Sequence, residues 1–267
     1  KELAIKLHKN GVIVKTYFHG SHSQYLDEYG WEMNNIIYNL EKKGIVSEMA
    51  FCKESLIEFY KDKKCNTTFL RNLVNIDFDI KKTKKKQDEL RVGVYAVQTR
   101  NWRKNVFSSL GAITLMNNSL KGKKKIIVDI VPKSEVAEDF MYILGIETDG
   151  VEKAIPRAEL IQRMSECDIN LYVTYSECAP MLPLESFYVD VPCITGNNHH
   201  YFKGTELEKY LVVNNENNPI DIKETIDNCL KNTDKVLSLY EKFSEDNLKE
   251  GQRLVKKFIN SEDDRNE

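Results

Sequence analysis

The stretch from Asp168 to Gly196, DINLYVTYSECAPMLPLESFYVDVPCITG, constrains the fold more than any other part of the chain. Its apolar, β-rich start predicts a buried strand, and Pro180 and Pro183 prevent that strand from continuing. Pro183 suits the first position of a helix, where its missing N–H costs no hydrogen bond. The predicted order is a strand over 169–175, a loop over 176–182, a helix from Pro183 and a strand over 191–195. Such a unit is typical of α/β folds, which bind ligands at the carboxyl end of the strand, facing the helix N-terminus.

Two carboxylates mark this end of the strand, Glu177 in the loop and Glu185 in the first turn expected for the helix. Each has a simple structural interpretation when it is taken alone. An acidic residue in a first turn stabilises the helix dipole by ~0.3–1 kcal/mol, and a loop glutamate is usually solvated. Only their joint occurrence in this strand–loop–helix context favours a binding site.

The segment from Glu177 to Ile194, ECAPMLPLESFYVDVPCI, resembles the donor-site signature of retaining glycosyltransferases of the GT-B fold. The usual form of that signature is close to E-G-F-G-L-P-L-L-E-A-M-A-x-G-x-P-V-I. Both glutamates and the later Pro192 keep its register without a gap. Three departures from it stand out. Cys178 replaces the glycine after the first glutamate, Pro183 lies one place later than the usual proline, and Asp190 replaces the glycine before the last strand.

Residues 1–80 alternate strands and helices, which predicts a parallel sheet with helices on its faces. Their order resembles the second half of the N-terminal domain of the same family. In that comparison His19-Gly20 ends one strand, Cys52 ends the next, and Asn72 or Asn75 follows the last. We expect the first half of that domain to be missing here and to be supplied by an N-terminal segment or a partner chain, because an open sheet edge needs cover.

The resemblance implies an α/β fold of the GT-B type, with two Rossmann-like domains built on parallel sheets, the N-terminal one only partly present. The expected organisation is a partial acceptor-side domain over 1–80, a linker over 81–89, a donor-binding domain over 90–245, and a C-terminal helix and tail over 246–267. Towards the C-terminus the pattern predicts, among other elements, strands over 150–155 and 211–214 and separate helices over 233–243 and 243–259.

The composition excludes several classes of protein. A chain of 267 residues with 41% hydrophobic residues can bury a sizeable core, and its net charge of −2 argues against nucleic acid as a partner. The six cysteines form no C-x-x-C pair, so we expect reduced thiols in a cytoplasmic protein, not disulfides or a zinc site. There is no signal peptide and no apolar run of ~20 residues, which predicts that nothing spans a membrane. Because the chain begins at Lys1, we expect a fragment.

The Lys-rich segment over 77–89, DFDIKKTKKKQDE, is typical of a solvated interdomain linker. A basic run of this kind can also contact anionic lipid headgroups, at ~1 kcal/mol per lysine near the surface. Peripheral contact with the inner face of the membrane therefore stays an alternative to a purely cytoplasmic location.

A nucleotide-sugar donor carries a diphosphate, which is bound by cations and oriented N–H groups. The basic loop QTRNWRKN over 98–105 supplies such cations at the end of the strand predicted over 92–97. The resemblance implies that Arg100 and Lys104 hold the diphosphate, with Lys104 opening the following helix. It also implies that the donor is lined by the backbone of Ala179, Pro180, Met181 and Leu182.

The resemblance assigns Glu185 to the ribose hydroxyls of the donor. A carboxylate suits a vicinal diol because it accepts two hydrogen bonds. The base is expected near Val131, Pro132 and residues 152–155, with Ile155 as a binding residue.

His19 and Glu177 are the catalytic candidates that the resemblance implies. The histidine would lie near the sugar and bond a donor hydroxyl or the acceptor, with His22 as the second choice. Glu177 would contact the sugar or the phosphates. No metal and no cofactor is implied, because basic side chains and helix dipoles neutralise the phosphates and the nucleotide-diphosphate sugar is itself a substrate.

The implied function is the transfer of a hexose from a nucleotide-diphosphate sugar to a glycan, lipid or protein acceptor in glycan biosynthesis, without a metal and with retention at the anomeric carbon. Two alternatives stay open: a catalytically inactive, glycosyltransferase-like binding or scaffold chain, and a nucleotide-sugar epimerase. A sugar phosphorylase would need a phosphate or cofactor-lysine site, which the sequence does not offer. Glycoside hydrolysis by a carboxylate pair is disfavoured, because that pair does not need the adjacent basic loop.

Overall fold

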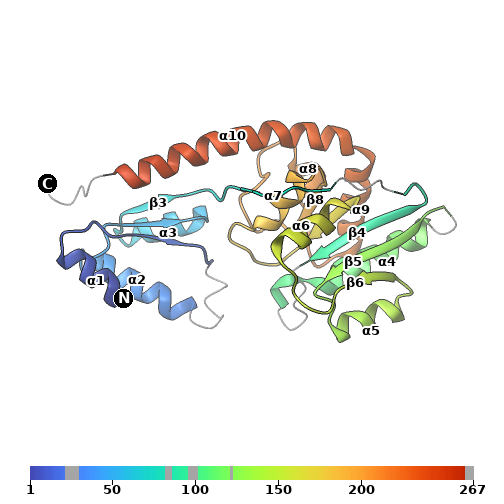
Figure 1. Cartoon of the computed structure of the whole chain (residues 1–267), viewed down its shortest axis with the longest axis horizontal. Helices are drawn as coiled ribbons and strands as arrows, with labels where there is room; N and C mark the ends of the chain where they lie inside the picture. The colour runs from blue at the N-terminus through green and yellow to red at the C-terminus, as the bar shows by residue number, and fades with distance from the viewer. Residues whose placement is uncertain (22–29, 82–85, 96–101, 121–122, 262–267) are drawn as a thin grey trace. The chain divides into compact units, whose positions relative to one another are not determined.

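A computed structural model describes residues 1–21, 30–81, 86–95, 102–120 and 123–261. The chain divides by its internal contacts into two compact units. Unit 1 comprises Lys1–Leu73, Ser176–Ala179 and Glu245–Glu267, and unit 2 comprises Val74–Tyr175 and Pro180–Ser244. Each unit is built on a parallel β-sheet with helices (Figure 1), so the predicted α/β class is confirmed.

Unit 1 contains a three-stranded parallel sheet in the order β1-β2-β3. The elements of this part of the chain are α1 (Glu2–Lys9), β1 (Lys15–Phe18), α2 (Gly30–Lys42), β2 (Glu48–Phe51), α3 (Glu54–Asp62) and β3 (Thr67–Phe69). Every residue of the central strand β2 is buried. The core of the unit includes Met49 and Phe51 of this strand and Leu56 and Tyr60 of α3.

Helix α2 confirms the helix predicted around residues 31–43. Ile36, Ile37 and Leu40 recur at helical spacing and pack on the core of unit 1. The helix ends because Gly44 adopts the left-handed region, with φ +69°. The Gly44 amide then donates to the Glu41 carbonyl at 2.8 Å, and the Ile45 amide donates to the Leu40 carbonyl at 2.9 Å.

Unit 2 contains a five-stranded sheet in the order β6-β5-β4-β7-β8, and every pair of neighbours is parallel. Its first elements are β4 (Glu89–Tyr95), the 3-10 turn η2 (Trp102–Lys104), α4 (Val106–Leu120), β5 (Lys125–Val131), α5 (Glu135–Ile143), β6 (Glu147–Gly150) and α6 (Arg157–Ser165). They are followed by β7 (Ile169–Tyr172), α7 (Met181–Tyr188), β8 (Cys193–Thr195), α8 (Glu208–Leu211), α9 (Pro219–Lys231) and α10 (Thr233–Asn260).

Two predicted strands are wrong. The strand expected over 150–155 lies earlier, because Glu147–Gly150 pairs with Ile127–Ile130 of β5 and the chain then leaves the sheet. Of the strand expected over 211–214, Leu211 ends α8, Val212 makes an isolated bridge to Thr195, and residues 213 and 214 form no strand.

Two predicted helix boundaries are also wrong. The last two helices form one continuous helix, α10, whose residues from Glu245 onward group with unit 1. Within that unit the Lys15 ammonium donates to the Phe258 carbonyl at 2.5 Å and to the Ser261 carbonyl at 2.7 Å. Helix α7 begins at Met181, before the predicted Pro183, because a first turn also leaves the amides of its second and third residues without intrahelical acceptors. As a consequence, Glu185 lies in the second turn.

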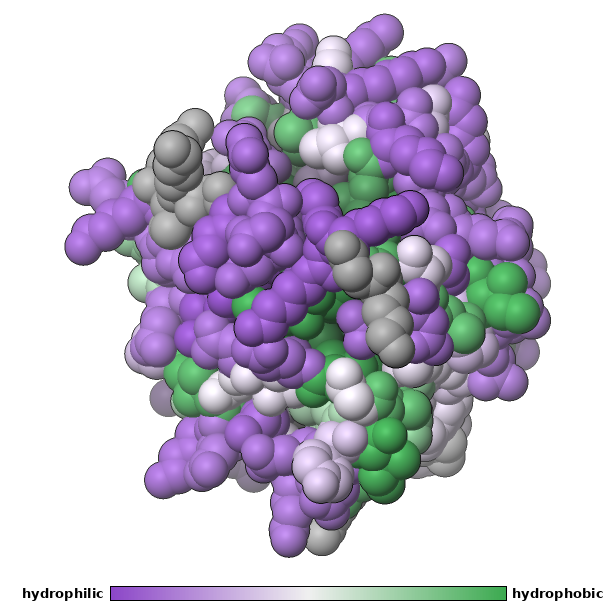
Figure 2. Space-filling view, turned by 90° about the vertical axis from the view of Figure 1, so that its right-hand side faces the viewer, coloured by the Kyte–Doolittle hydropathy of each residue, from purple (hydrophilic) through white to green (hydrophobic). Residues whose placement is uncertain are grey.

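The face of the molecule seen in Figure 2 is mostly hydrophilic, with separate hydrophobic patches. Charged residues make up 30% of the sequence, which accounts for this surface. Within the described residues, no helix combines the length and the apolar character needed to cross a membrane.

Candidate functional site

The strand order of unit 2 places a topological switch point between β4 and β7. From β4 the chain builds the sheet in one direction through β5 and β6, and it then returns to add β7 and β8 on the other side of β4. The connections after β4 and after β7 therefore diverge at the same edge of the sheet. In open α/β sheets this is the position where ligands bind.

Lys104 lies on the first of these connections, where it ends the 3-10 turn η2; Asn105 separates it from α4, so it precedes the helix and does not open it as predicted. Its ammonium group donates to the Tyr172 hydroxyl at 2.8 Å and lies 5.1 Å from the centre of that ring. Tyr172 is the last residue of β7, so this contact joins the two connections at the switch point. The Tyr175 amide also donates to the Arg103 carbonyl at 2.8 Å, and the rings of Trp102 and Tyr175 stack at 6.1 Å. Arg100, the other predicted diphosphate ligand, lies outside the described residues.

Helix α7 presents its N-terminus after β7. Pro180 is the N-cap residue, and among the described residues no side chain caps the helix. Since Pro183 has no N–H, Met181 and Leu182 supply the backbone donors of the first three helical positions. Leu182 is buried and Met181 is half-buried. Two such amides at a helix N-terminus are suited to bind an anion.

Glu185 is buried in unit 2 and forms an ion pair that the sequence did not reveal. Arg157, the first residue of α6, donates from Nε to Glu185 Oε1 at 2.7 Å. Its two terminal nitrogens each lie 3.2 Å from the Asn75 carbonyl. Within the described part of the chain Glu185 Oε2 makes no hydrogen bond, so one carboxylate oxygen is held and the other is available. The only sequence signal for Arg157 is its position at the start of a helix beside Ile155.

Ile155 is half-buried in the connection between β6 and α6, not in a strand. Lys104, Glu185, Arg157 and Ile155 thus all belong to unit 2. They come from the connections that follow β4, β6 and β7, or from the helices that those connections open.

Pro180, Met181 and Leu182 also belong to unit 2, whereas His19, Glu177 and Ala179 belong to unit 1, where the segment Ser176–Ala179 packs. The Cys178 thiol donates to the Gly20 carbonyl at 3.0 Å, so His19-Gly20 and Glu177-Cys178 lie side by side. The Lys53 ammonium donates to the Glu177 carbonyl at 2.9 Å. Lys53 was not among the predicted site residues. The sequence feature that could have indicated it is its position directly after the strand that ends near Cys52.

Asn72 also holds this segment. Its Nδ2 donates to the Ala179 carbonyl at 2.7 Å, and its Oδ1 accepts from the Tyr17 hydroxyl at 2.8 Å. Of the two asparagines that the sequence left open, Asn72 is therefore the one that contacts the glutamate-bearing segment, whereas the Asn75 carbonyl binds Arg157 in unit 2.

Burial and hydrogen bonding shift the pKa values of His19, Cys52 and Cys178 in unit 1 in different directions. His19 is exposed but packs against Tyr17 with the ring centres 4.0 Å apart, and partial burial of the imidazole lowers its pKa. The imidazole is therefore mainly neutral at pH 7 and able to accept a hydrogen bond. The hydrogen bond between Cys52 and Cys178 lowers the pKa of Cys52 and raises that of Cys178. Cys52 is thus the thiol that ionises first.

The replacement of the family glycine by Cys178 leads to a redox prediction. The Cys52 and Cys178 sulfur atoms lie 3.2 Å apart, and a disulfide needs ~2.05 Å, so only a small approach is required. We expect hydrogen peroxide to join them: each thiol loses one electron and one proton, and the peroxide is reduced to water. Peptide mass spectrometry without reductant would detect the cross-link. Cys65, a buried free thiol, is the matched control, and cross-links distributed at random among the cysteines would contradict the prediction.

The six cysteines are buried, and none of them forms a disulfide among the described residues. Among the described residues, no group of three or more His, Cys, Asp or Glu side chains is arranged to hold a metal ion.

Comparison with known proteins identifies the fold. No protein family and no curated protein matches the sequence. Solved structures do match. TarM superposes with a TM-score of 0.66 at 12% identity over 93% of this chain and 50% of its own. HepE of Anabaena, solved in complex with UDP, superposes with a TM-score of 0.67 at 12% identity, over 97% of this chain and 75% of its own. The pneumococcal O-GlcNAc transferase GtfA, solved with UDP and GlcNAc, superposes with a TM-score of 0.61 at 11% identity, over 97% of this chain and 55% of its own.

These proteins are glycosyltransferases of the GT-B fold. The present chain has the GT-B fold, which confirms the predicted architecture of parallel sheets. It spans about half the length of TarM. At such low identity the likeness establishes the fold, and the activity has to be argued from the site.

Proposed function

We propose that the chain binds a nucleotide-diphosphate sugar and transfers its sugar to an acceptor. The observation that carries this proposal is the switch point of the five-stranded sheet, where Lys104 is fixed against Tyr172 beside the connection that opens α7. A fixed cation and free helix amides match the charge of a diphosphate. HepE and GtfA were solved with UDP, so a uridine nucleotide is the first ligand to test.

Each predicted residue, in unit 1 or in unit 2, has a role in the proposed reaction. Lys104 and the α7 amides bind the diphosphate and stabilise the negative charge that it gains as the bond to the sugar breaks. Glu185, oriented by Arg157, accepts hydrogen bonds from the ribose hydroxyls through its available oxygen. His19 and Glu177 act on the sugar or the acceptor hydroxyl. Arg100 adds a second cation to the diphosphate, and Ile155 packs against the base.

The proposal also covers the sugar, the stereochemistry of transfer, the acceptor and the neutralisation of the phosphates. The sugar is a hexose transferred with retention at the anomeric carbon, the acceptor is a glycan, lipid or protein, and the phosphates are neutralised by the chain's own cations. The buried thiols fit a reducing, cytoplasmic setting, with contact at the inner face of the membrane through the Lys-rich segment.

Calorimetric titration with UDP, ADP, GDP and their sugars tests the donor site. A ligand at 100 times its dissociation constant should also stabilise the folded chain by ~2.7 kcal/mol. Binding of one nucleotide series supports the proposal, and binding of none contradicts it. Analysis of the products separates the alternatives, because an epimerase converts the nucleotide sugar without an acceptor and an inactive chain binds it unchanged.

Replacing Glu185 by alanine should weaken binding of the preferred nucleotide by ~10- to 100-fold. The reason is the loss of charge-assisted hydrogen bonds to the ribose, which are worth ~1.5–3 kcal/mol. Calorimetry gives the affinity, and a thermal melt shows whether loss of the Arg157 ion pair has unfolded the variant. Glu159→Ala removes an exposed glutamate of α6 and is the matched control. An unchanged affinity in a folded Glu185→Ala variant would remove Glu185 from the donor site.

A further inference from the structure

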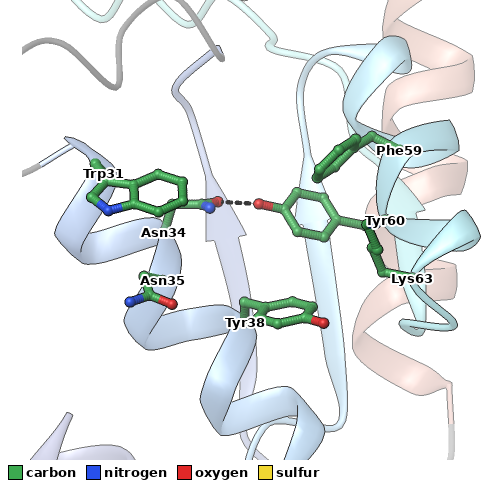
Figure 3. A pocket seen from close by; sticks show the side chains of 7 residues that line it. All are labelled: Trp31, Asn34, Asn35, Tyr38, Phe59, Tyr60 and Lys63. Carbon is green, nitrogen blue, oxygen red and sulfur yellow. Dashed lines mark hydrogen bonds between the residues drawn. The ribbon is translucent and has the colours of Figure 1, made fainter.

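A pocket of 490 Å³ lies between α2 and α3 in unit 1 (Figure 3). Pockets of ~300–1,000 Å³ are the usual size for small-molecule sites. One wall comes from one face of α2, whose lining residues recur at helical spacing, and the other from the end of α3. The lining residues are Trp31, Asn34, Asn35, Tyr38, Phe59, Tyr60 and Lys63.

The floor of the pocket is fixed by the core. The Tyr60 hydroxyl donates to Asn34 Oδ1 at 2.5 Å, and both side chains are buried. The Tyr60 ring also stacks on Phe51, with ring centres 5.0 Å apart and planes 5° apart. Because Asn34 Oδ1 is used by Tyr60, its Nδ2 group, for which the described residues provide no acceptor, remains to donate to a ligand.

The walls are aromatic and open to solvent. Trp31 is 60% exposed and Phe59 is 42% exposed, although both are large apolar side chains. Phe59 stands edge-on to Tyr60, with the planes 87° apart, and Tyr38 lies 6.1 Å from Tyr60. Figure 3 shows the α2 and α3 side chains facing one another across the pocket. Exposed aromatic surface of this kind marks an interaction site.

Polar groups are placed at the edge of these rings. The Lys63 ammonium lies 5.7 Å from the centre of the Phe59 ring, which positions it at the rim. Asn35 Oδ1 accepts from Asn39 Nδ2 at 2.8 Å, which orients the Asn35 amide. The pocket thus combines flat apolar faces with amide and ammonium donors around them.

We propose that this pocket binds a saccharide ring of a glycan. A pyranose presents an apolar C–H face, which stacks on an aromatic ring, and a rim of hydroxyls, which accept from amide and ammonium donors. A purely apolar peptide would leave the buried Asn34 donor unpaired, at a cost. None of the lining residues belongs to the donor site, so saccharide binding here does not depend on the proposed transfer reaction.

Tryptophan fluorescence gives a direct test, because Trp31 and Trp102 are the two tryptophans of the sequence. In a Trp102→Phe variant the emission reports on Trp31 alone. We expect a saturable change in that emission with at least one of glucose, galactose, N-acetylglucosamine, maltose and chitobiose. Phe59→Ala in the same background should weaken that binding at least 10-fold, whereas Met33→Ala, an exposed apolar residue of α2 outside the lining, should leave it unchanged.

Three results would overturn the proposal. One is the absence of a saturable change with any of the five sugars. Another is equal weakening by Met33→Ala and Phe59→Ala. The last is displacement of the sugar by UDP, which would place it in the donor site. A failure of the donor-site proposal can be distinguished from a failure of this one. UDP binding is measured without sugar, and the sugar-dependent change in Trp31 emission is measured without UDP.

Discussion

Replacing Lys104 by methionine is expected to slow transfer of the sugar by ~10²- to 10³-fold, the cost of removing one preorganised group that stabilises developing charge. In the proposed reaction the nucleoside diphosphate would leave with added negative charge. Lys104 is held at the switch point, with its ammonium group 2.8 Å from the Tyr172 hydroxyl. Methionine has nearly the same length and keeps the contact with the Tyr172 ring. The substitution therefore removes the charge while it preserves packing.

The rate is measured as nucleoside diphosphate released from the nucleotide sugar, and calorimetry gives the affinity for the free nucleotide. Lys124→Met, which removes an exposed lysine after α4, is the matched control and should change neither value. If Lys104→Met also changes neither, the diphosphate does not bind at the carboxyl end of β4 and the donor site proposed here is wrong.

Local patterns in the sequence predicted much of this fold. The apolar residues of α2 recur at helical spacing, and Gly44 marks its end, so a helix is expected from neighbouring residues alone. The change from strand β7 to helix α7 is also visible, because Pro180 and Pro183 cannot lie inside a buried strand and proline is tolerated in the first turn of a helix. Such features depend on short-range sterics and burial, which the order of residues encodes directly.

The substitution at Asp190 shows what only the structure explains. Asp190 has φ +60°, in the left-handed region, where the family signature has glycine. Aspartate is one of the few residues with a side chain that tolerates this conformation, so the turn before β8 survives the change. The resemblance identified the departure, and the backbone angle shows why the fold accepts it.

The features that the sequence did not predict depend on contacts between residues that are far apart in the sequence. Strand β6 has the polar sequence ETDG, and it is a strand because it pairs with β5 at the edge of the sheet. Arg157 reaches Glu185 across 28 positions of sequence, and Cys178 reaches Cys52 across 126. No periodicity in the sequence marks these pairs, since each is formed only after the chain has folded.

A buried charge network in unit 2 also depends on contacts between residues far apart in the sequence. Replacing its central carboxylate, Asp129→Ala, is expected to lower the free energy of unfolding by ~3 kcal/mol. Asp129 is fully buried in β5 and accepts hydrogen bonds from Arg91 at 2.7 Å and from Arg163 at 3.0 Å. Burial raises the pKa of Asp129, and the two guanidinium groups oppose that rise. Without the carboxylate, both arginines lose their buried partner, and the half-exposed Asp149 is the acid that remains to them among the described residues.

Urea unfolding of the wild type and the variant measures this loss. Glu147→Ala is the control, because Glu147 lies on the neighbouring strand β6 and pairs with Lys125 at 2.8 Å, with both side chains more than half exposed. Exposed pairs of this kind contribute ~0–1 kcal/mol, so the control should unfold almost as the wild type does. Equal losses in the two variants would mean that the network stabilises unit 2 no more than a surface ion pair does. A large loss for Asp129→Ala alone would show that the sheet carrying the switch point depends on its buried carboxylate, since β5 is the neighbour of β4, the strand that leads to Lys104.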